Sequence, residues 1–301
     1  MDVEVLEPRT VEEAAALRGE HGDEAKLIAG GTALVLMLRN RLIAPRYLIS
    51  LNTLPGLRDV SYQPGEGLRL GALATIAQAE RAAVVRERYP ALADTYHKVA
   101  NVRVRWAATV GGNLTEADYA SDPPAMLVAL DARVQATGPN GSREIPIGEF
   151  FLDYYETALA PDEVLTEIRV PEPVAGTRAT YLKFITRSSE DRPCVGVAAT
   201  LRRDATGACE DLRVVVGAVA GTPQRLPEAE ALARGKAPSA ALFQEIGDAY
   251  AQAIDPIDDV RGSAWYRRRM VRVLVARALE QLANEPSALS HQPSAQDGPR
   301  S

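Results

Sequence analysis

The chain has 301 residues, a formal net charge of −6 at pH 7, 46% hydrophobic residues and 25% charged residues. This length exceeds what one small hydrophobic core requires and predicts two or three domains of an ordinary soluble globular protein. The acidic balance argues against a nucleic-acid-binding protein, because binding a phosphate backbone requires clustered Lys and Arg.

The first predicted unit, residues 1–55, places helices and strands around a glycine turn. Thr10 followed by Glu13 is a capping box for an Ala-rich helix that extends to about residue 18. Residues 26–29 and 47–51 predict two short strands. Between them lies Gly30-Gly31-Thr32, where Thr32 is expected to cap a second helix that stops at Pro45. That helix would place on one face Leu34, Val35, Leu38 and Leu42.

The next stretch carries a second glycine turn. A strand is expected at 68–73, and Thr75 with Gln78 predicts a capping box for a helix to about residue 88. Pro90 suits the first turn of a further helix, to about residue 99. The second glycine turn spans residues 107–114. Asn140-Gly141 predicts a hairpin after a strand at 131–137, and residues 164–170 predict another strand.

The pattern changes after about residue 173. Residues 181–186, 195–202 and 212–220 read as antiparallel strands, and helices follow. Arg267, Arg268 and Arg269 fall in the last of these helices and are expected on its solvated face or at a protein contact. Residues 286–301 predict a disordered tail. The last helix is expected to bury Val271, Leu274, Val275, Ala278, Leu279 and Leu282.

Metal sites and membrane segments are not expected. Cys194 and Cys209 fit neither a disulfide framework nor a four-thiolate iron–sulfur site. His21, His97 and His291 lie far apart, which argues against a zinc site. The N-terminus is acidic and lacks the apolar segment of a signal peptide, and no apolar run reaches the length of a membrane span, so the cytoplasm is the expected location.

The two glycine turns have the chemistry of a phosphate site. In an acidic protein a diphosphate needs local donors, which backbone N–H groups in a turn supply, and glycine allows the backbone to come close. A helix that starts at the turn adds its positive end. Gly30-Gly31-Thr32 follows a strand and precedes a helix, and Thr109 to Asn113 offers a second set of N–H groups. Either turn alone is more often an ordinary turn, and the G-x-G-x-x-G fingerprint of Rossmann folds is absent.

Five ordered blocks resemble a known family across residues 1–285. The chain resembles the FAD-binding medium subunit of carbon monoxide dehydrogenase and the flavin domain of xanthine dehydrogenases, which belong to the molybdenum hydroxylases. The blocks are residues 29–34, residues 109–132 with both Gly111-Gly112-Asn113 and Ser121-Asp122-Pro123-Pro124, residues 150–159, residues 181–198 and residues 259–267.

The resemblance implies an α+β fold in three parts. Residues 1–55 and 56–172 would form the two lobes of a FAD domain of the vanillyl-alcohol-oxidase (PCMH) type. Residues 173–285 would form a smaller C-terminal α+β domain of the carbon monoxide dehydrogenase flavoprotein type. The FAD would lie between the lobes, with its diphosphate held by both glycine turns.

The resemblance also assigns FAD-binding residues. Asp122 would bind the adenosine or ribityl part; from the residues alone it also reads as a helix cap before Pro123. Leu165 would pack against the adenine or belong to a strand core. Lys183 would approach the flavin or its phosphates, or stand on an edge strand. The first diphosphate loop would consist of Leu27, Ile28, Ala29, Gly30, Gly31, Thr32, Ala33 and Leu34, and the second of Thr109, Val110, Gly111, Gly112 and Asn113.

Three departures from the family pattern affect the expected site. Ala33 replaces a common Asp, which removes a polar contact. Residues 106–108, Trp-Ala-Ala, replace the usual Arg-Gly before the second turn, so that Trp106 either shields the flavin or packs. Tyr119 stands where a proline is common.

The resemblance implies an electron-transfer role without catalytic residues on this chain. Electrons would come from a small subunit with two 2Fe–2S clusters, pass through FAD and reach an external acceptor, while a large molybdopterin subunit oxidises the substrate. A dimer of such heterotrimers is expected. The residues leave open a stand-alone flavin oxidoreductase and a flavin-free assembly protein. They also leave open the substrate and the terminal acceptor.

Overall fold

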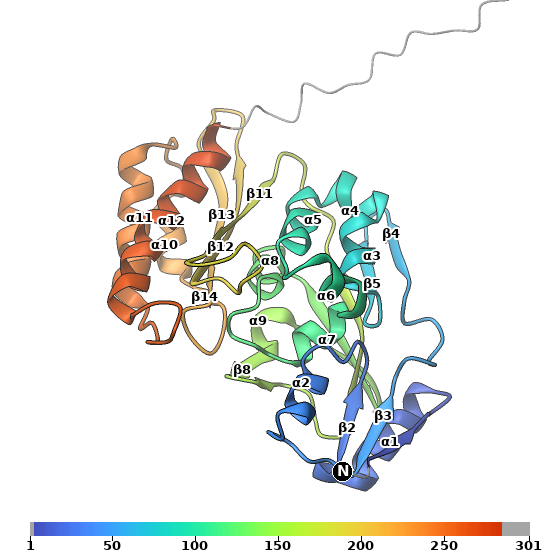
Figure 1. The fold of residues 1–301 in the computed structure, drawn as a ribbon. Coiled ribbons are helices and arrows are strands. Elements are labelled where there is room, and N and C mark those ends of the chain that lie inside the picture. The colour runs from blue at the N-terminus through green and yellow to red at the C-terminus, as the bar shows by residue number, and fades with distance from the viewer. Residues whose placement is uncertain (1–2, 285–301) are drawn as a thin grey trace, which may run out of the picture.

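The computed structural model describes residues 3–284 and contains a three-stranded, a five-stranded and a four-stranded sheet, plus a two-stranded ribbon (Figure 1). The predicted tail, 286–301, lies outside the described residues. The three sheets follow one another along the chain, at residues 4–50, 60–170 and 178–225. None of the helices in residues 3–284 has both the length and the apolar character needed to cross a bilayer.

The first sheet is parallel and has the order β1-β3-β2. Its small apolar core consists of buried side chains from α1 and the strands, among them Ala14, Ala25 and Ile49. The sequence did not predict strand β1. The elements are β1 (Glu4–Leu6), α1 (Val11–His21), a 3-10 turn (Gly22–Glu24), β2 (Ala25–Ile28), α2 (Leu34–Arg39) and β3 (Tyr47–Ser50).

The second sheet is antiparallel, with the order β4-β5-β10-β6-β7. Central strand β10 (Val164–Val170) confirms the strand predicted at these residues and buries five of its seven side chains. The predicted hairpin is confirmed, because Gly138 pairs with Gly141 across the turn at Asn140. The other strands are β4 (Val60–Gln63), β5 (Gly67–Gly71), β6 (Arg133–Gly138) and β7 (Gly141–Pro146).

Short helices connect β5 to β6. The predicted capping box at Thr75 and Gln78 is confirmed, with both reciprocal hydrogen bonds present. The expected helix to residue 88 breaks at Ala82 into two. The helices are α3 (Ile76–Arg81), α4 (Ala83–Arg88), α5 (Pro90–His97), α6 (Val102–Ala107), α7 (Val110–Thr115) and α8 (Pro123–Ala129), and α9 (Ile147–Phe150), β8 (Phe151–Asp153) and β9 (Glu156–Thr157) follow β7.

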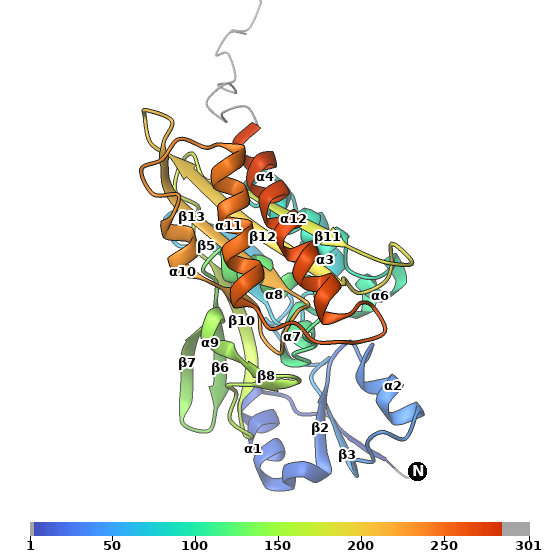
Figure 2. The same cartoon turned by 90° about the vertical axis from the view of Figure 1, so that its left-hand side faces the viewer.

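The third sheet has the order β11-β12-β13-β14, and helices α11 and α12 cover one face (Figure 2). The apolar face predicted for the last helix is confirmed, because all six named side chains are buried. The opposite sheet face packs on α8 through Ala198 and Val215, which joins this sheet to the core of the second one. The elements are β11 (Arg178–Phe184), β12 (Val195–Arg203), β13 (Cys209–Gly217), β14 (Gln224–Arg225), α10 (Pro227–Ala231), α11 (Ala240–Ala253) and α12 (Ala264–Asn284).

Two expectations about helices are wrong. The helix after the first glycine turn ends at Arg39, before Leu42, and buries none of its side chains. Arg267 does not lie on a solvated face of α12: its side chain is fully buried and pairs with Asp259. A charged residue is an uncommon choice for a core position, so a helical pattern of apolar residues gives no signal of this pair.

Candidate functional site

The first glycine turn presents free backbone donors. It connects β2 to α2, and Gly31 has a φ of +70°, which favours glycine. Among residues 3–284, no acceptor faces the four successive N–H groups from Gly30 to Ala33. The turn is partly exposed, so these donors are open to a ligand. Successive free amides in such a turn form an anion-binding concavity.

Thr32 does not cap α2, contrary to expectation. The N-cap position falls on Ala33, which has no side-chain acceptor. The helix therefore starts one residue later than predicted, and the donors belong to the turn itself. The resemblance leads us to expect an Asp at this position, and Ala33 has no side-chain acceptor for the helix start.

Four of the five amides predicted for the second glycine turn, those of Val110 to Asn113, are already paired within the protein. The N–H of Val110 donates to Ala74 O and that of Gly111 to Ala72 O, each at 2.8 Å. Those of Gly112 and Asn113 donate to the Thr109 hydroxyl and carbonyl oxygens. Gly111 lies against Ala72. Because glycine has no side chain, the Ala72 backbone comes close to it, and no space is left there for a phosphate.

The structure brings the two turns together. A Cβ atom on Gly30 would lie 2.0 Å from Ala107 O and 3.0 Å from Ala108 Cα. Ala107 is the last residue of α6, directly before the second turn. In both views α2 lies below α6, on the side of the first sheet (Figures 1 and 2). The free amides of the first turn therefore stand at a junction between the first sheet and the helices of the second unit.

Asp122 and Lys183 are paired with each other. Lys183 Nζ lies 2.9 Å from Asp122 Oδ2 and also donates to Lys98 O, while the Tyr181 hydroxyl donates to Asp122 Oδ1 at 2.8 Å. Burial raises the pKa of Asp122 to about 6, against the opposing effect of Lys183. Asp122 precedes α8 but makes no side-chain capping bond, so the capping alternative is wrong. Lys183 stands on edge strand β11, yet its ammonium group is buried.

The remaining predicted residues flank these groups. Leu165 is 4% exposed and lies in the core of the second unit, and its contact with adenine stays a prediction. Trp106 is half exposed, with the Arg81 guanidinium 5.0 Å from its ring centre. Asn113 receives a hydrogen bond from Ser121 through Oδ1.

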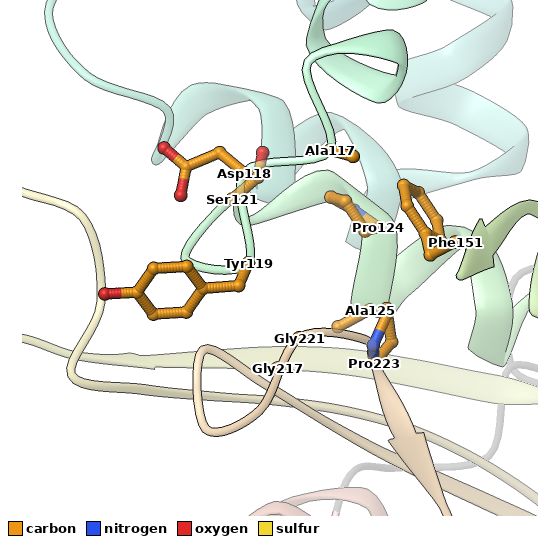
Figure 3. Close-up of a pocket in the computed structure, with 10 residues that line it drawn as sticks. All are labelled: Ala117, Asp118, Tyr119, Ser121, Pro124, Ala125, Phe151, Gly217, Gly221 and Pro223. Atoms are coloured by element: carbon orange, nitrogen blue, oxygen red, sulfur yellow. The ribbon is translucent and has the colours of Figure 1, made fainter. Parts of the chain in front are cut away.

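Sequence reasoning missed a polar cluster before α8. The Tyr119 hydroxyl donates to Asp259 at 2.6 Å, and Arg192 lies 2.6 Å from the buried Asp118 carboxylate. Figure 3 shows Asp118 and Tyr119 beside a cavity closed by Phe151 and the end of β13. The cavity measures about 10 Å³, enough for one water molecule and too little for a cofactor. The resemblance covered Asp118 and Asp259, and Tyr119 was noted as a departure from the family pattern, but nothing in the sequence gave a reason to place them together.

Comparisons with known proteins decide the family. Residues 1–173 match the model described as "FAD binding domain in molybdopterin dehydrogenase", and residues 180–282 match "CO dehydrogenase flavoprotein C-terminal domain". The chain belongs to the FAD-binding subunits of the molybdopterin dehydrogenases. The resemblance and the fold class predicted from the sequence are thereby confirmed.

Relatives of this FAD-binding subunit serve different enzymes. The carbon monoxide dehydrogenase medium chain of Hydrogenophaga pseudoflava is 34% identical, over 90% of this chain and 94% of the relative. The 6-hydroxypseudooxynicotine dehydrogenase complex subunit alpha of Paenarthrobacter nicotinovorans is 32% identical over 90% of both chains. The solved carbon monoxide dehydrogenase from H. pseudoflava aligns with a TM-score of 0.89 at 35% identity, over 93% of this chain and 96% of that one.

The first turn of this FAD-binding subunit suits the diphosphate of FAD. It combines free amides, a left-handed glycine and close backbone approach to α6, and these features suit a doubly charged anion. Within residues 3–284, no cluster of His, Cys, Asp and Glu is placed to hold a metal ion, and both cysteines are buried free thiols.

Proposed function

We propose that this subunit transfers electrons, through bound FAD, from the iron–sulfur clusters of a partner subunit to an external acceptor. The proposal rests on similarity over nearly the whole chain to medium chains of multi-subunit dehydrogenases. The small subunit would carry two 2Fe–2S clusters, and a large subunit the molybdopterin. Two such heterotrimers would pair, in the cytoplasm. Two buried cysteines on this chain are too few for such clusters, which fits this division of labour.

One structural observation supports the place where FAD would bind: the unpaired amides of Gly30 to Ala33, where the two turns meet. We propose that these amides hold the FAD diphosphate, and that residues 27–29 and Leu34 line the same loop. The second turn would contribute by holding Ala107 against Gly30 and by its Asn113 side chain. Bound FAD supplies the redox chemistry, and this chain positions it. FAD contacts of Asp122, Leu165 and Lys183 stay predictions.

We also propose the domain limits expected from the sequence. The first sheet falls within residues 1–55, the second within 56–172 and the third within 173–285. The first two parts would act as lobes on either side of the cofactor, since the paired turns lie where the lobes meet.

The direct mutational test is Gly30→Ala, with Gly148→Ala as the matched control. The added methyl group at residue 30 would collide with Ala107 O and push the turns apart, whereas nothing lies within 4 Å of such a group at residue 148. FAD affinity should fall roughly a hundredfold, about 3 kcal/mol, only in Gly30→Ala. Isothermal titration of the apo chain with FAD measures this change. Equal affinities in both variants would contradict the proposed diphosphate site.

The same preparation separates the electron-transfer role from a stand-alone flavin oxidoreductase. The FAD-loaded chain alone should show no steady turnover with aldehydes, purines or heterocycles. Sustained turnover by the isolated chain would favour the stand-alone enzyme.

A further inference from the structure

Helix α2 (Leu34–Arg39) is apolar, but it buries none of its side chains. Val35 and Leu36 are 50% and 56% exposed, and Leu42, just after the helix, is 72% exposed. Single exposed apolar residues are common on proteins, whereas several on one short segment indicate an interaction surface. By contrast, α12 buries the whole apolar face that its sequence predicts.

The charge around α2 differs from that of the rest of the chain. The chain is acidic overall, yet no Asp or Glu occurs between Glu24 and Asp59. Exposed Arg39 and Arg41 flank the apolar side chains, and neither takes part in an ion pair within the described part of the chain. Apolar side chains bordered by unpaired arginines are typical of a protein interface. The partner that fits is apolar at its centre, with carboxylates at its rim.

The position of α2 identifies which subunit needs to bind there. The helix starts directly after the free amides of Gly30 to Ala33, and Figure 2 shows it at the edge of the molecule. Across the turn, α6 ends at Ala107 beside Gly30 and carries half-exposed Trp106. A protein on α2 therefore lies next to the cofactor loop. In the proposed function, the subunit that has to come close to the cofactor is the one that carries the iron–sulfur clusters.

We propose that α2, with Leu42, Arg39 and Arg41, is the docking surface for the iron–sulfur subunit. This inference rests on the proposed electron-transfer function and deepens it by naming the surface. The exposed side chains of α2 are not buried against the rest of this chain, so their replacement should leave the fold of the isolated subunit intact.

The test compares Leu36→Asp with Val174→Asp in the full-length tagged chain, purified from its native host under mild conditions. Val174 is 61% exposed and lies between β10 and β11, so it offers a matched apolar-to-acidic change away from α2. The readouts are iron per flavin, flavin per chain and the subunits that co-purify. We expect Leu36→Asp to keep its flavin and lose at least about 90% of the iron, a tenfold effect, whereas Val174→Asp keeps both.

Four results would overturn the docking surface in different ways. Wild-type protein that captures no iron would remove the proposed function together with it. Iron retained by Leu36→Asp would overturn the surface alone. Loss of flavin together with iron, or loss only of a second copy of this chain, would show that α2 serves the cofactor loop or self-association instead.

The arginines give a second, independent variant. Arg39→Glu combined with Arg41→Glu places acidic groups opposite the expected carboxylates, and it lies farther from the cofactor loop. Capture of the iron–sulfur subunit should fall at least about tenfold at low salt. Unchanged capture would contradict the predicted acidic rim.

Discussion

At the scale of single residues, the buried pair of Asp122 and Lys183 links the start of α8 to strand β11 of the third sheet. Its carboxylate already accepts hydrogen bonds from Tyr181 and Lys183. Removing a charge from water is costly, and burial is the largest influence on the pKa of Asp122, which rises to about 6. The pair therefore holds the entry to α8 against β11, and its titration is coupled to folding.

Asp122→Asn tests this coupling through pH. The folded pKa of about 6 lies above the ordinary value of 3.8, so folding takes up a proton between these values. The free energy of unfolding of the wild type should therefore fall as pH rises from about 4 to 6, by about 3 kcal/mol at most. Urea unfolding at a series of pH values should show this slope, and Asp122→Asn should lack it. The same slope in both proteins would refute the assignment.

At the scale of elements, the two glycine turns look alike in sequence but differ in structure. Gly31 adopts a positive φ and leaves the amides of its turn free, whereas Gly111 lets α7 approach Ala72 and the amides from Val110 to Asn113 are all hydrogen-bonded within the protein. Their local pattern predicted both turns, the Thr75 capping box and the hairpin at Asn140, because these depend on neighbouring residues. Whether the backbone amides of a turn find acceptors within the protein depends on which distant segment packs against that turn. The local sequence pattern does not show which segment this is.

Gly111→Ala tests the structural role of the second turn. The new methyl carbon would lie 2.6 Å from Ala72 Cβ and 2.8 Å from Ala72 O. Such crowding should lower the free energy of unfolding of the FAD-free chain by about 1 to 3 kcal/mol. Chemical denaturation measures this change, with Gly148→Ala as the control. If the FAD-free variant kept its full stability but no longer bound FAD, the result would indicate that Gly111 lies against the FAD diphosphate.

At the scale of the whole molecule, a polar network fastens the third sheet to the second unit. Asp259 receives hydrogen bonds from Tyr119, Arg261 and Arg267, and Arg267 also donates to Ala218 O at the end of β13. The resemblance covered Asp259 and Arg267, yet the helical pattern placed Arg267 in solvent. Its burial depends on packing among four separate segments, so the sequence of α12 alone contains no sign of it.

Arg267→Met measures what this network contributes. Removing the cation leaves the Asp259 carboxylate without its buried partner, which should destabilise the protein by about 3 to 5 kcal/mol. Replacing Asp259 by Leu in the same protein should restore part of the loss. Thermal unfolding of the wild type and of the single and double variants measures these differences in stability. An Arg267→Met variant as stable as the wild type would exclude a structural role for the pair.

The central claim is that the amides of Gly30 to Ala33 hold the FAD diphosphate, and amide hydrogen exchange tests it most directly. In the FAD-free chain these four amides should exchange rapidly, whereas those of Val110 to Asn113 should already be protected by their hydrogen bonds. Saturation with FAD should slow exchange from Gly30 to Ala33 at least about tenfold and change Val110 to Asn113 far less. Unchanged exchange at Gly30 to Ala33 in the FAD-saturated protein would contradict the account.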